Sequence, residues 1–239
     1  METVLSSPPF SSDKVGRFSY LATGSILSYV IYQQTGKTPL EYAQDELFPA
    51  LGITGTVTWW PTHGSNGIQE GGHGLVLSPL ELVKLGLLYR DGGVTAAGTQ
   101  LIPADFVEAA RTDQLSSRIP STSLAYLGAA CAFKSAGAGY GYLKWLFTTQ
   151  SGPVDCAVGH QGQFICTWPD LDVIVAITSS GLTGYQSSCE LLDFVATGLD
   201  FDSRVDLGGI RTHARAHTHT RTHAHTPTGK PLVLEFGRR

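Results

Sequence analysis

The sequence has few charged residues and no long hydrophobic run, and each absence excludes a class of function. Charged residues make up 15% of the 239 positions. Residues 1–210 hold 10 lysines and arginines against 19 aspartates and glutamates, so this part offers no basic surface to nucleic acid phosphates. No stretch approaches about eighteen consecutive apolar residues, so we expect no membrane span. The start, Met1-Glu2-Thr3, lacks the basic and apolar character of a secretory signal, and a cytoplasmic location is the default expectation.

Cysteine is also scarce, and its spacing carries no redox or metal motif. The four cysteines are far apart and form no C-x-x-C pair: Cys131, Cys156, Cys166 and Cys189. This spacing favours free, buried thiols and does not indicate a redox compartment. His63 and His73 flank a glycine-rich loop without a His-x-His-x-Asp pattern, so we expect no metal site in the body of the chain and no cofactor.

Residues 201–239 differ in composition from the rest of the chain. Residues 211–226 alternate Thr, His, Arg and Ala and hold five of the eight histidines. The pairs His217-x-His219 and His223-x-His225 could bind a divalent metal. However, alternating Thr and His is also what a repetitive CA dinucleotide encodes, and we favour that interpretation over a functional one. With almost no apolar residues, the segment is expected to be disordered.

Helix signals concentrate in the first half of the chain and strand signals in the second. Thr38-Pro39-Leu40-Glu41 and Ser78-Pro79-Leu80-Glu81 each combine an N-cap, a proline at the first helical position and a glutamate at the third, which is a capping box. Gly92 is a plausible stop for the second helix. A further helix is expected from Tyr185 to Thr197. The chain is therefore expected to have helices before residue 115, strands over 125–178 and one closing helix. This order predicts an α+β fold with helices packed on an antiparallel sheet.

The stretch from Gly159 to Ile177 predicts a hairpin that begins with a candidate ligand-binding step at His160. Phe164–Thr167 and Val173–Ile177 are separated by a Pro169-Asp170 turn, so we expect them to pair as antiparallel neighbours. The second run is apolar throughout, which indicates burial on both faces. Glycines around His160 let the backbone approach a ligand, and strand N–H groups beside an imidazole suit the stabilisation of an oxyanion. An ordinary hairpin with a surface histidine is the simpler alternative.

Several motifs, in their order, resemble the β-lactamase-related serine hydrolases of the class C β-lactamase and penicillin-binding-protein superfamily. Gly16, Phe18 and Tyr20 match the Gly-x-x-Phe-x-Tyr step, and the helical run Thr23 to Thr35 follows it. Further matches then follow at approximately the family's spacing: Pro39 to Ile53, Gly71 to Leu75, Ser78 to Gly93, Gly139 to Tyr142 and His160-x-Gly162. The resemblance covers roughly residues 15–198 and implies a β-lactamase/transpeptidase-like fold that hydrolyses small amides or esters by acyl transfer.

The resemblance also implies roles for individual residues. In the family, a Ser-x-x-Lys turn supplies a serine nucleophile, and a tyrosine or lysine takes its proton. Tyr20 is then the candidate general base or proton shuttle, and His160 stands where the family carries a wall lysine. The N–H of Gln163, the residue after Gly162, would donate to the oxyanion. We expect Tyr20 and His160 to face a common cleft.

Two departures from the family pattern bear on activity. Ala22 stands where the family has an asparagine, and its methyl group makes none of the amide's hydrogen bonds. The one Ser-x-x-Lys match, Ser11 to Lys14, lies in a polar, proline-rich context only six residues before Tyr20. Such short motifs also occur by chance, and we interpret this one as a decoy.

These observations give two hypotheses for the chain. The first is a serine hydrolase whose N-terminal part, with the nucleophile, is missing, so that it is incomplete and inactive. The second is a non-catalytic, degenerate relative or gene-model fragment that serves at most as a binding or interaction module. In both, residues 1–14 form a disordered or irregular segment, 15–200 a partial domain and 201–239 a low-complexity His/Thr/Arg tail that is expected to be disordered. A small amide or ester is the expected partner if the chain is active, and the sequence does not specify the substrate or the oligomeric state.

Overall fold

The computed structural model describes residues 23–61, 67–115, 138–149, 152–179, 192 and 231–235. The chain divides into two compact units, Met1–Leu77 and Ser78–Arg239. The predicted domain over residues 15–200 spans both of them.

The first unit is mainly helical. Helix α2 covers Thr23–Thr35, as expected, and α3 covers Pro39–Tyr42 and continues into a π-helical turn over Ala43–Leu47. The predicted capping box at Thr38 is present: its side chain accepts from the Glu41 N–H, and the Glu41 carboxylate accepts from the Thr38 N–H at 2.8 Å. Strands β1 (Thr58–Trp59) and β2 (Leu75–Val76) pair antiparallel. Buried Ala43, Phe48, Ile53 and Val57 form the core of this unit.

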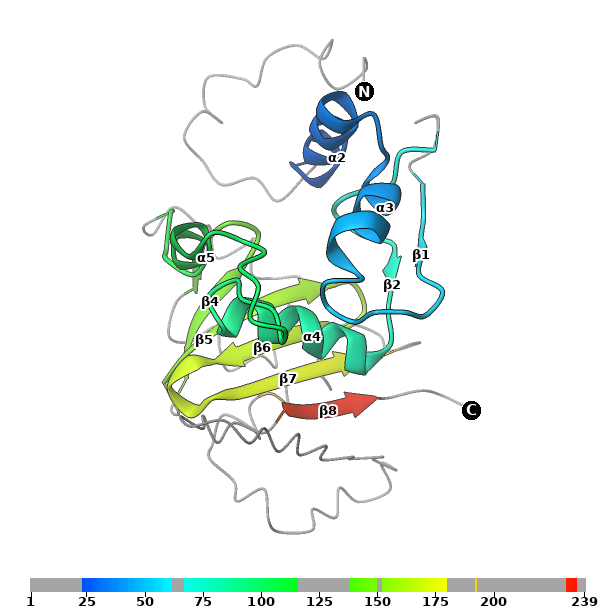
Figure 1. The fold of residues 1–239 in the computed structure, drawn as a ribbon. Helices are drawn as coiled ribbons and strands as arrows, with labels where there is room; N and C mark the ends of the chain where they lie inside the picture. The colour runs from blue at the N-terminus through cyan, green and yellow to red at the C-terminus, as the bar shows by residue number, and fades with distance from the viewer. Residues whose placement is uncertain are drawn as a thin grey trace. The chain divides into compact units, whose positions relative to one another are not determined.

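The second unit is built on a six-stranded sheet in the order β3-β4-β5-β6-β7-β8 (Figure 1). Its strands are β3 (Ala138–Tyr140), β4 (Trp145–Thr149), β5 (Gly152–Gly159), β6 (Gln163–Trp168), β7 (Val173–Thr178) and β8 (Pro231–Glu235). Strands β3 to β7 form an antiparallel meander, and only the β7–β8 pair is parallel. The unit therefore has the α+β, antiparallel architecture that the sequence predicts.

The predicted hairpin is confirmed. Strands β6 and β7 pair antiparallel with Phe164 opposite Ile177, and a 3-10 turn over Pro169–Leu171 connects them. The four central residues of β7, Ile174 to Ile177, are all buried, as the apolar run predicts. The helix expected from Tyr185 lies outside the described residues except for Leu192, which is helical and fully buried.

Two helices of the second unit lie on one face of this sheet. Helix α4 (Pro79–Arg90) starts with the predicted capping box at Ser78 and ends before Gly92, whose φ of 64° is the left-handed conformation of a C-terminal stop. It packs against β6 and β7 through Gly86, where an added Cβ would lie 2.8 Å from Cγ2 of Ile174 and 3.2 Å from Cγ2 of Ile165. Helix α5 covers Ala104–Ala110. Among the described residues, none of the helices has the length and apolar character needed to cross a membrane.

Strand β8 lies within residues 201–239, where the sequence predicts a disordered tail. Pro231 to Glu235 pair with Ile174 to Thr178 and cover the outer edge of β7. The apolar run Leu232-Val233-Leu234 is a short strand signal, but its pairing joins residues more than fifty positions apart, which the sequence does not indicate.

Candidate active site

The β5–β6 turn carries the histidine that the sequence singled out. His160, Gln161 and Gly162 connect the two strands, and Gly159 and Gln163 form the last register pair before the turn. Gln161 and Gly162 both have left-handed backbone conformations, with φ of 61° and 84°. Glycine adopts such a conformation readily, whereas glutamine does so at a cost in free energy. His160 is exposed, and its ring has no hydrogen-bond partner within the part of the chain that the structure describes.

Side-chain bonds from Gln163 hold this turn against the end of β7. The Gln163 amide oxygen accepts from the Ser179 N–H at 3.1 Å, and its amide nitrogen donates to the Ser179 carbonyl at 2.5 Å. The Ser179 hydroxyl in turn donates to the Gln161 carbonyl. The sequence motif predicts a role for Gln163 through its backbone N–H alone, and the structure adds a role for its side chain in fixing the backbone on either side of Gly162.

Replacing Gln163 by alanine should loosen this turn. We expect Gln163→Ala to lower the free energy of unfolding by about 1–3 kcal/mol, because two bonds to the Ser179 backbone are lost and that backbone is left partly buried. Urea unfolding measures the change. Gln161→Ala is the matched control, since only its backbone carbonyl takes part, and it should have a much smaller effect. Equal losses in the two variants would contradict the role of the Gln163 side chain.

The other predicted catalytic residue is not placed by this structure. Tyr20, together with Ser11, Lys14 and Ala22, lies outside the described residues. The expectation that Tyr20 and His160 share a cleft therefore stays a prediction. The histidines of residues 211–226 are also outside the described part, and within the described ranges no three His, Cys, Asp or Glu side chains gather as a metal site would require.

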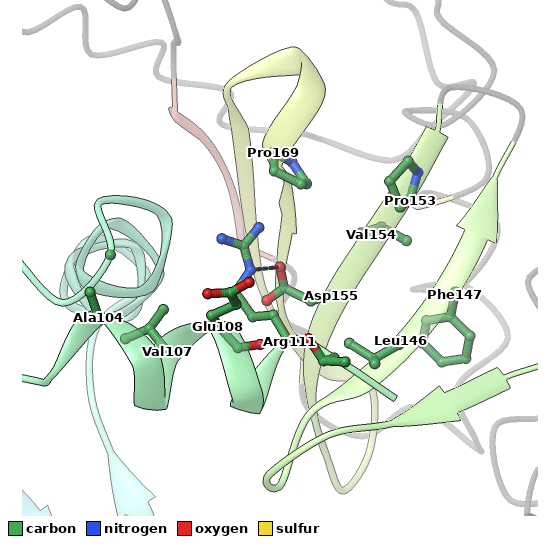
Figure 2. Close-up of a pocket in the computed structure, with 12 residues that line it drawn as sticks. Ala104, Val107, Glu108, Arg111, Leu146, Phe147, Pro153, Val154, Asp155 and Pro169 are labelled. Atoms are coloured by element: carbon green, nitrogen blue, oxygen red, sulfur yellow. Dashed lines mark hydrogen bonds and ion pairs between the residues drawn. The ribbon is translucent and has the colours of Figure 1, made fainter. Parts of the chain in front are cut away.

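Asp155, Lys144 and Arg111 form a buried charged cluster that the sequence did not lead us to expect. Asp155 on β5 is only 4% exposed and accepts from Nε of Arg111 at 2.9 Å (Figure 2). It also pairs with Nζ of Lys144. Lys144 is 6% exposed, and its ammonium lies 4.3 Å from the centre of the Tyr89 ring. The strand register explains the pair: Asp155 is opposite Leu146, so Lys144, two residues earlier, is its diagonal neighbour on the same face.

Burial shifts the ionisation of this cluster. Removal from water lowers the pKa of Lys144 below its usual 10.5, and the negative charge of Asp155 opposes that shift. Burial raises the pKa of Tyr89, and the Asp155 charge adds to the increase. One signal for the cluster was available in the sequence: Asp155 interrupts the apolar run Val154 to Val158, and a charge inside a buried strand requires a partner.

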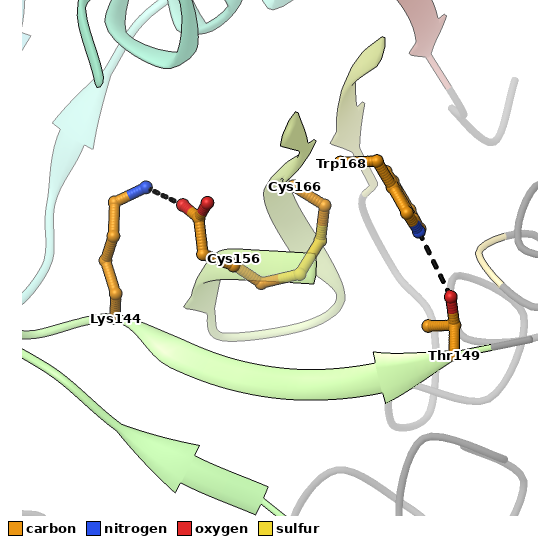
Figure 3. Close-up of a disulfide and its surroundings, with 6 residues drawn as sticks. Lys144, Thr149, Cys156, Cys166 and Trp168 are labelled. Carbon is orange, nitrogen blue, oxygen red and sulfur yellow. Dashed lines mark hydrogen bonds and ion pairs between the residues drawn. A yellow bond between two sulfur atoms is a disulfide. The ribbon is translucent and has the colours of Figure 1, made fainter. Parts of the chain in front are cut away.

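The expectation of free thiols is wrong for two of the four cysteines. Cys156 on β5 and Cys166 on β6 form a disulfide with a Cα–Cα distance of 4.1 Å (Figure 3). They are directly opposite in the β5–β6 register, so the hairpin itself brings them together. Cys156 and Cys166 are ten residues apart, on either side of the His160 turn. This spacing indicates a disulfide only once β5 is recognised as the strand that pairs with β6.

A family model and a solved structure resemble this chain. Residues 1–199 match the sequence family described as "Beta-lactamase". Among solved structures, the chain is similar to a Bacillus anthracis protein named "Putative 6-aminohexanoate-dimer hydrolase", with 21% identity and a TM-score of 0.49. That match covers 68% of this chain and 37% of the other, so the chain spans little more than a third of that protein's length. No protein with a curated description matches the chain.

Proposed function

The chain belongs to the beta-lactamase family, and on that premise we propose that it derives from a serine hydrolase that cleaves a small amide or ester by acyl transfer. We propose further that residues 1–239 alone do not catalyse this reaction. The descent from a serine hydrolase is supported mainly by the turn at His160. There an exposed imidazole lies beside left-handed backbone at the start of β6, and the Gln163–Ser179 bonds fix that backbone in place.

The proposed chemistry assigns one task to each predicted residue. A serine oxygen attacks the substrate carbonyl, and Tyr20 takes the serine proton. The N–H of Gln163 donates to the oxyanion, and Gly162 permits the close approach because it has no Cβ. His160 supplies a polar wall where related enzymes carry a lysine. Tyr20 passes that proton to the leaving group as the bond to the carbonyl carbon breaks, which gives an acyl-enzyme that water then hydrolyses.

The proposed inactivity rests on the nucleophile. Ser11 to Lys14 is the single Ser-x-x-Lys in the sequence, and its neighbours Ser6 to Phe10 are polar and proline-rich rather than those of a buried helix. Lys14 also precedes Tyr20 by only six residues, whereas the family brings the two motifs together from separate elements. Ala22 removes the amide that would contact the substrate carbonyl or the helper lysine.

One observation favours the alternative, a non-catalytic interaction module. Helix α2 leaves Ile26, Leu27 and Val30 exposed by 41%, 45% and 47%. Helices of globular proteins usually bury such aliphatic side chains against another element. This apolar surface suits contact with another protein segment, and we expect poor solubility of the isolated chain.

Ester turnover tests the proposed inactivity. We expect purified 1–239 to hydrolyse nitrophenyl esters no faster than Ser11→Ala does, because we interpret Ser11 as a decoy and not as the nucleophile. Hydrolysis of nitrophenyl acetate followed by absorbance measures both rates. If Ser11→Ala hydrolyses the ester about tenfold or more slowly than the unaltered chain, Ser11 is the nucleophile. That result would contradict the decoy interpretation.

A further inference from the structure

A cavity of about 390 Å³ lies between helix α5 and the ends of strands β4, β5 and β6 (Figure 2). Most of its walls are apolar and come from both the helix and the sheet: Ala104, Val107, Leu146, Phe147, Pro153, Val154 and Pro169. Arg111 and Asp155 contribute charge, and Glu108 contributes a third charged group. The volume is within the range of small-molecule sites, and apolar walls with a few polar groups are typical of them.

The cavity is at the opposite end of the strands from the His160 turn. That turn joins the end of β5, Gly159, to the start of β6, Gln163. The cavity is bordered by the start of β5, at Pro153, and by Pro169, directly after β6. Its lining residues all belong to the second unit, so its geometry does not depend on the first.

Arg111 is the polar anchor of this cavity. Its Nε donates to Oδ2 of Asp155, and its side chain keeps 20% of its surface exposed. Within the described part of the chain, its two terminal nitrogens, Nη1 and Nη2, have no hydrogen-bond or ion-pair partner. Figure 2 shows the guanidinium beside Asp155, on the side of the cavity bordered by Pro169.

The terminal N–H groups of Arg111, rather than the net charge, favour an anion here. Asp155 offers one negative charge to two cations, Lys144 and Arg111, and with Glu108 on the cavity wall the four groups are together neutral. A guanidinium with a free pair of N–H groups matches the two oxygens of a carboxylate. Glu108 is exposed, and its negative charge disfavours a second anionic group on the ligand.

We propose that this cavity binds a small monocarboxylate with an apolar body. The carboxylate accepts from Nη1 and Nη2 of Arg111, and the body packs against Val107, Leu146 and Pro153. The site is independent of the acyl-transfer chemistry proposed above, because it uses neither His160 nor Gln163.

Calorimetric titration of the full chain with sodium pentanoate tests this site. We expect one pentanoate to bind per chain, and pentan-1-ol, of equal length without the charge, to bind weaker by about tenfold or more. Glutarate, with a second carboxylate, should also bind more weakly than pentanoate. Equal binding of pentan-1-ol and pentanoate, or no binding of pentanoate, would overturn the proposal.

Two variants and a control locate the binding. Arg111→Gln should weaken pentanoate binding by about tenfold or more, since the paired N–H groups are lost. Ala104→Phe, at an exposed helix position that lines the cavity, should abolish binding by filling the space while it leaves Arg111 intact. Arg90→Gln is the matched control, because Arg90 also pairs with aspartates but does not line the cavity, and it should bind as the unaltered chain does. If Arg111→Gln does not fold, Ala104→Phe decides, and unchanged affinity in that variant would place the ligand elsewhere.

Discussion

Asp155→Asn should destabilise the chain by about 3–5 kcal/mol, because it leaves the buried Lys144 ammonium without its counter-charge. Lys144 is 6% exposed, so water cannot replace the lost carboxylate, and the Tyr89 ring 4.3 Å away compensates only part of the loss. Urea unfolding at about pH 7 gives the free energy. Asp170→Asn is the matched control: this residue is exposed, and its substitution should change stability by less than about 0.5 kcal/mol.

The pH dependence of stability distinguishes this cause from a general packing defect. Burial holds the pKa of Lys144 in the folded chain below the value of 10.5 expected after unfolding, so between these two values the unfolded chain binds more protons. Stability linked to Lys144 therefore increases as pH rises through that window. Asp155→Asn removes the influence that raises the Lys144 pKa, so the increase should begin at a lower pH in the variant.

A double variant provides the second control for the same interpretation. Adding Lys144→Met to Asp155→Asn removes the uncompensated charge and should recover part of the lost stability. A loss for Asp155→Asn below about 1 kcal/mol, or no recovery in the double variant, would contradict the view that the pair is a coupled buried unit.

Supplying a nucleophile should produce the largest change in activity. If an in-frame upstream exon encodes Ser-x-x-Lys on an apolar helix, the extended chain should exceed 1–239 in kcat/KM for ester hydrolysis by about 10³-fold or more. The reason is that oxyanion donors and a proton acceptor stabilise a transition state that forms only when a nucleophile attacks. Changing the upstream serine to alanine should return the extended chain to the activity of 1–239. An extended chain that is no more active than 1–239 would favour a degenerate, non-catalytic relative.

The sequence predicted those elements whose signals are local. The capping boxes at Thr38 and Ser78 are formed by residues three positions apart, so the helix starts were readable. The β6–β7 hairpin was readable because a short turn separates two runs of strand residues. In each case the stabilising contacts join neighbours in the chain.

Contacts that depend on how the strands pair could not be predicted from the sequence. Lys144 and Asp155 meet because β4 and β5 pair with Leu146 opposite Asp155, and Cys156 and Cys166 meet because of the β5–β6 register. Arg111, the polar anchor of the cavity, follows helix α5 and pairs with Asp155 on β5, 44 residues later in the chain. No local sequence pattern indicates a contact over that separation. The role of the Gln163 side chain likewise depends on where β7 ends, at Ser179.

Covalent labelling is the most direct test of whether residues 1–239 lack a working nucleophile. Purified chain is incubated with a labelled fluorophosphonate or a labelled β-lactam, and its intact mass is measured before and after. We predict no adduct, because we interpret the single Ser-x-x-Lys of the sequence, Ser11 to Lys14, as a decoy. A stoichiometric adduct that maps to Ser11, and that is lost in Ser11→Ala, would contradict this account.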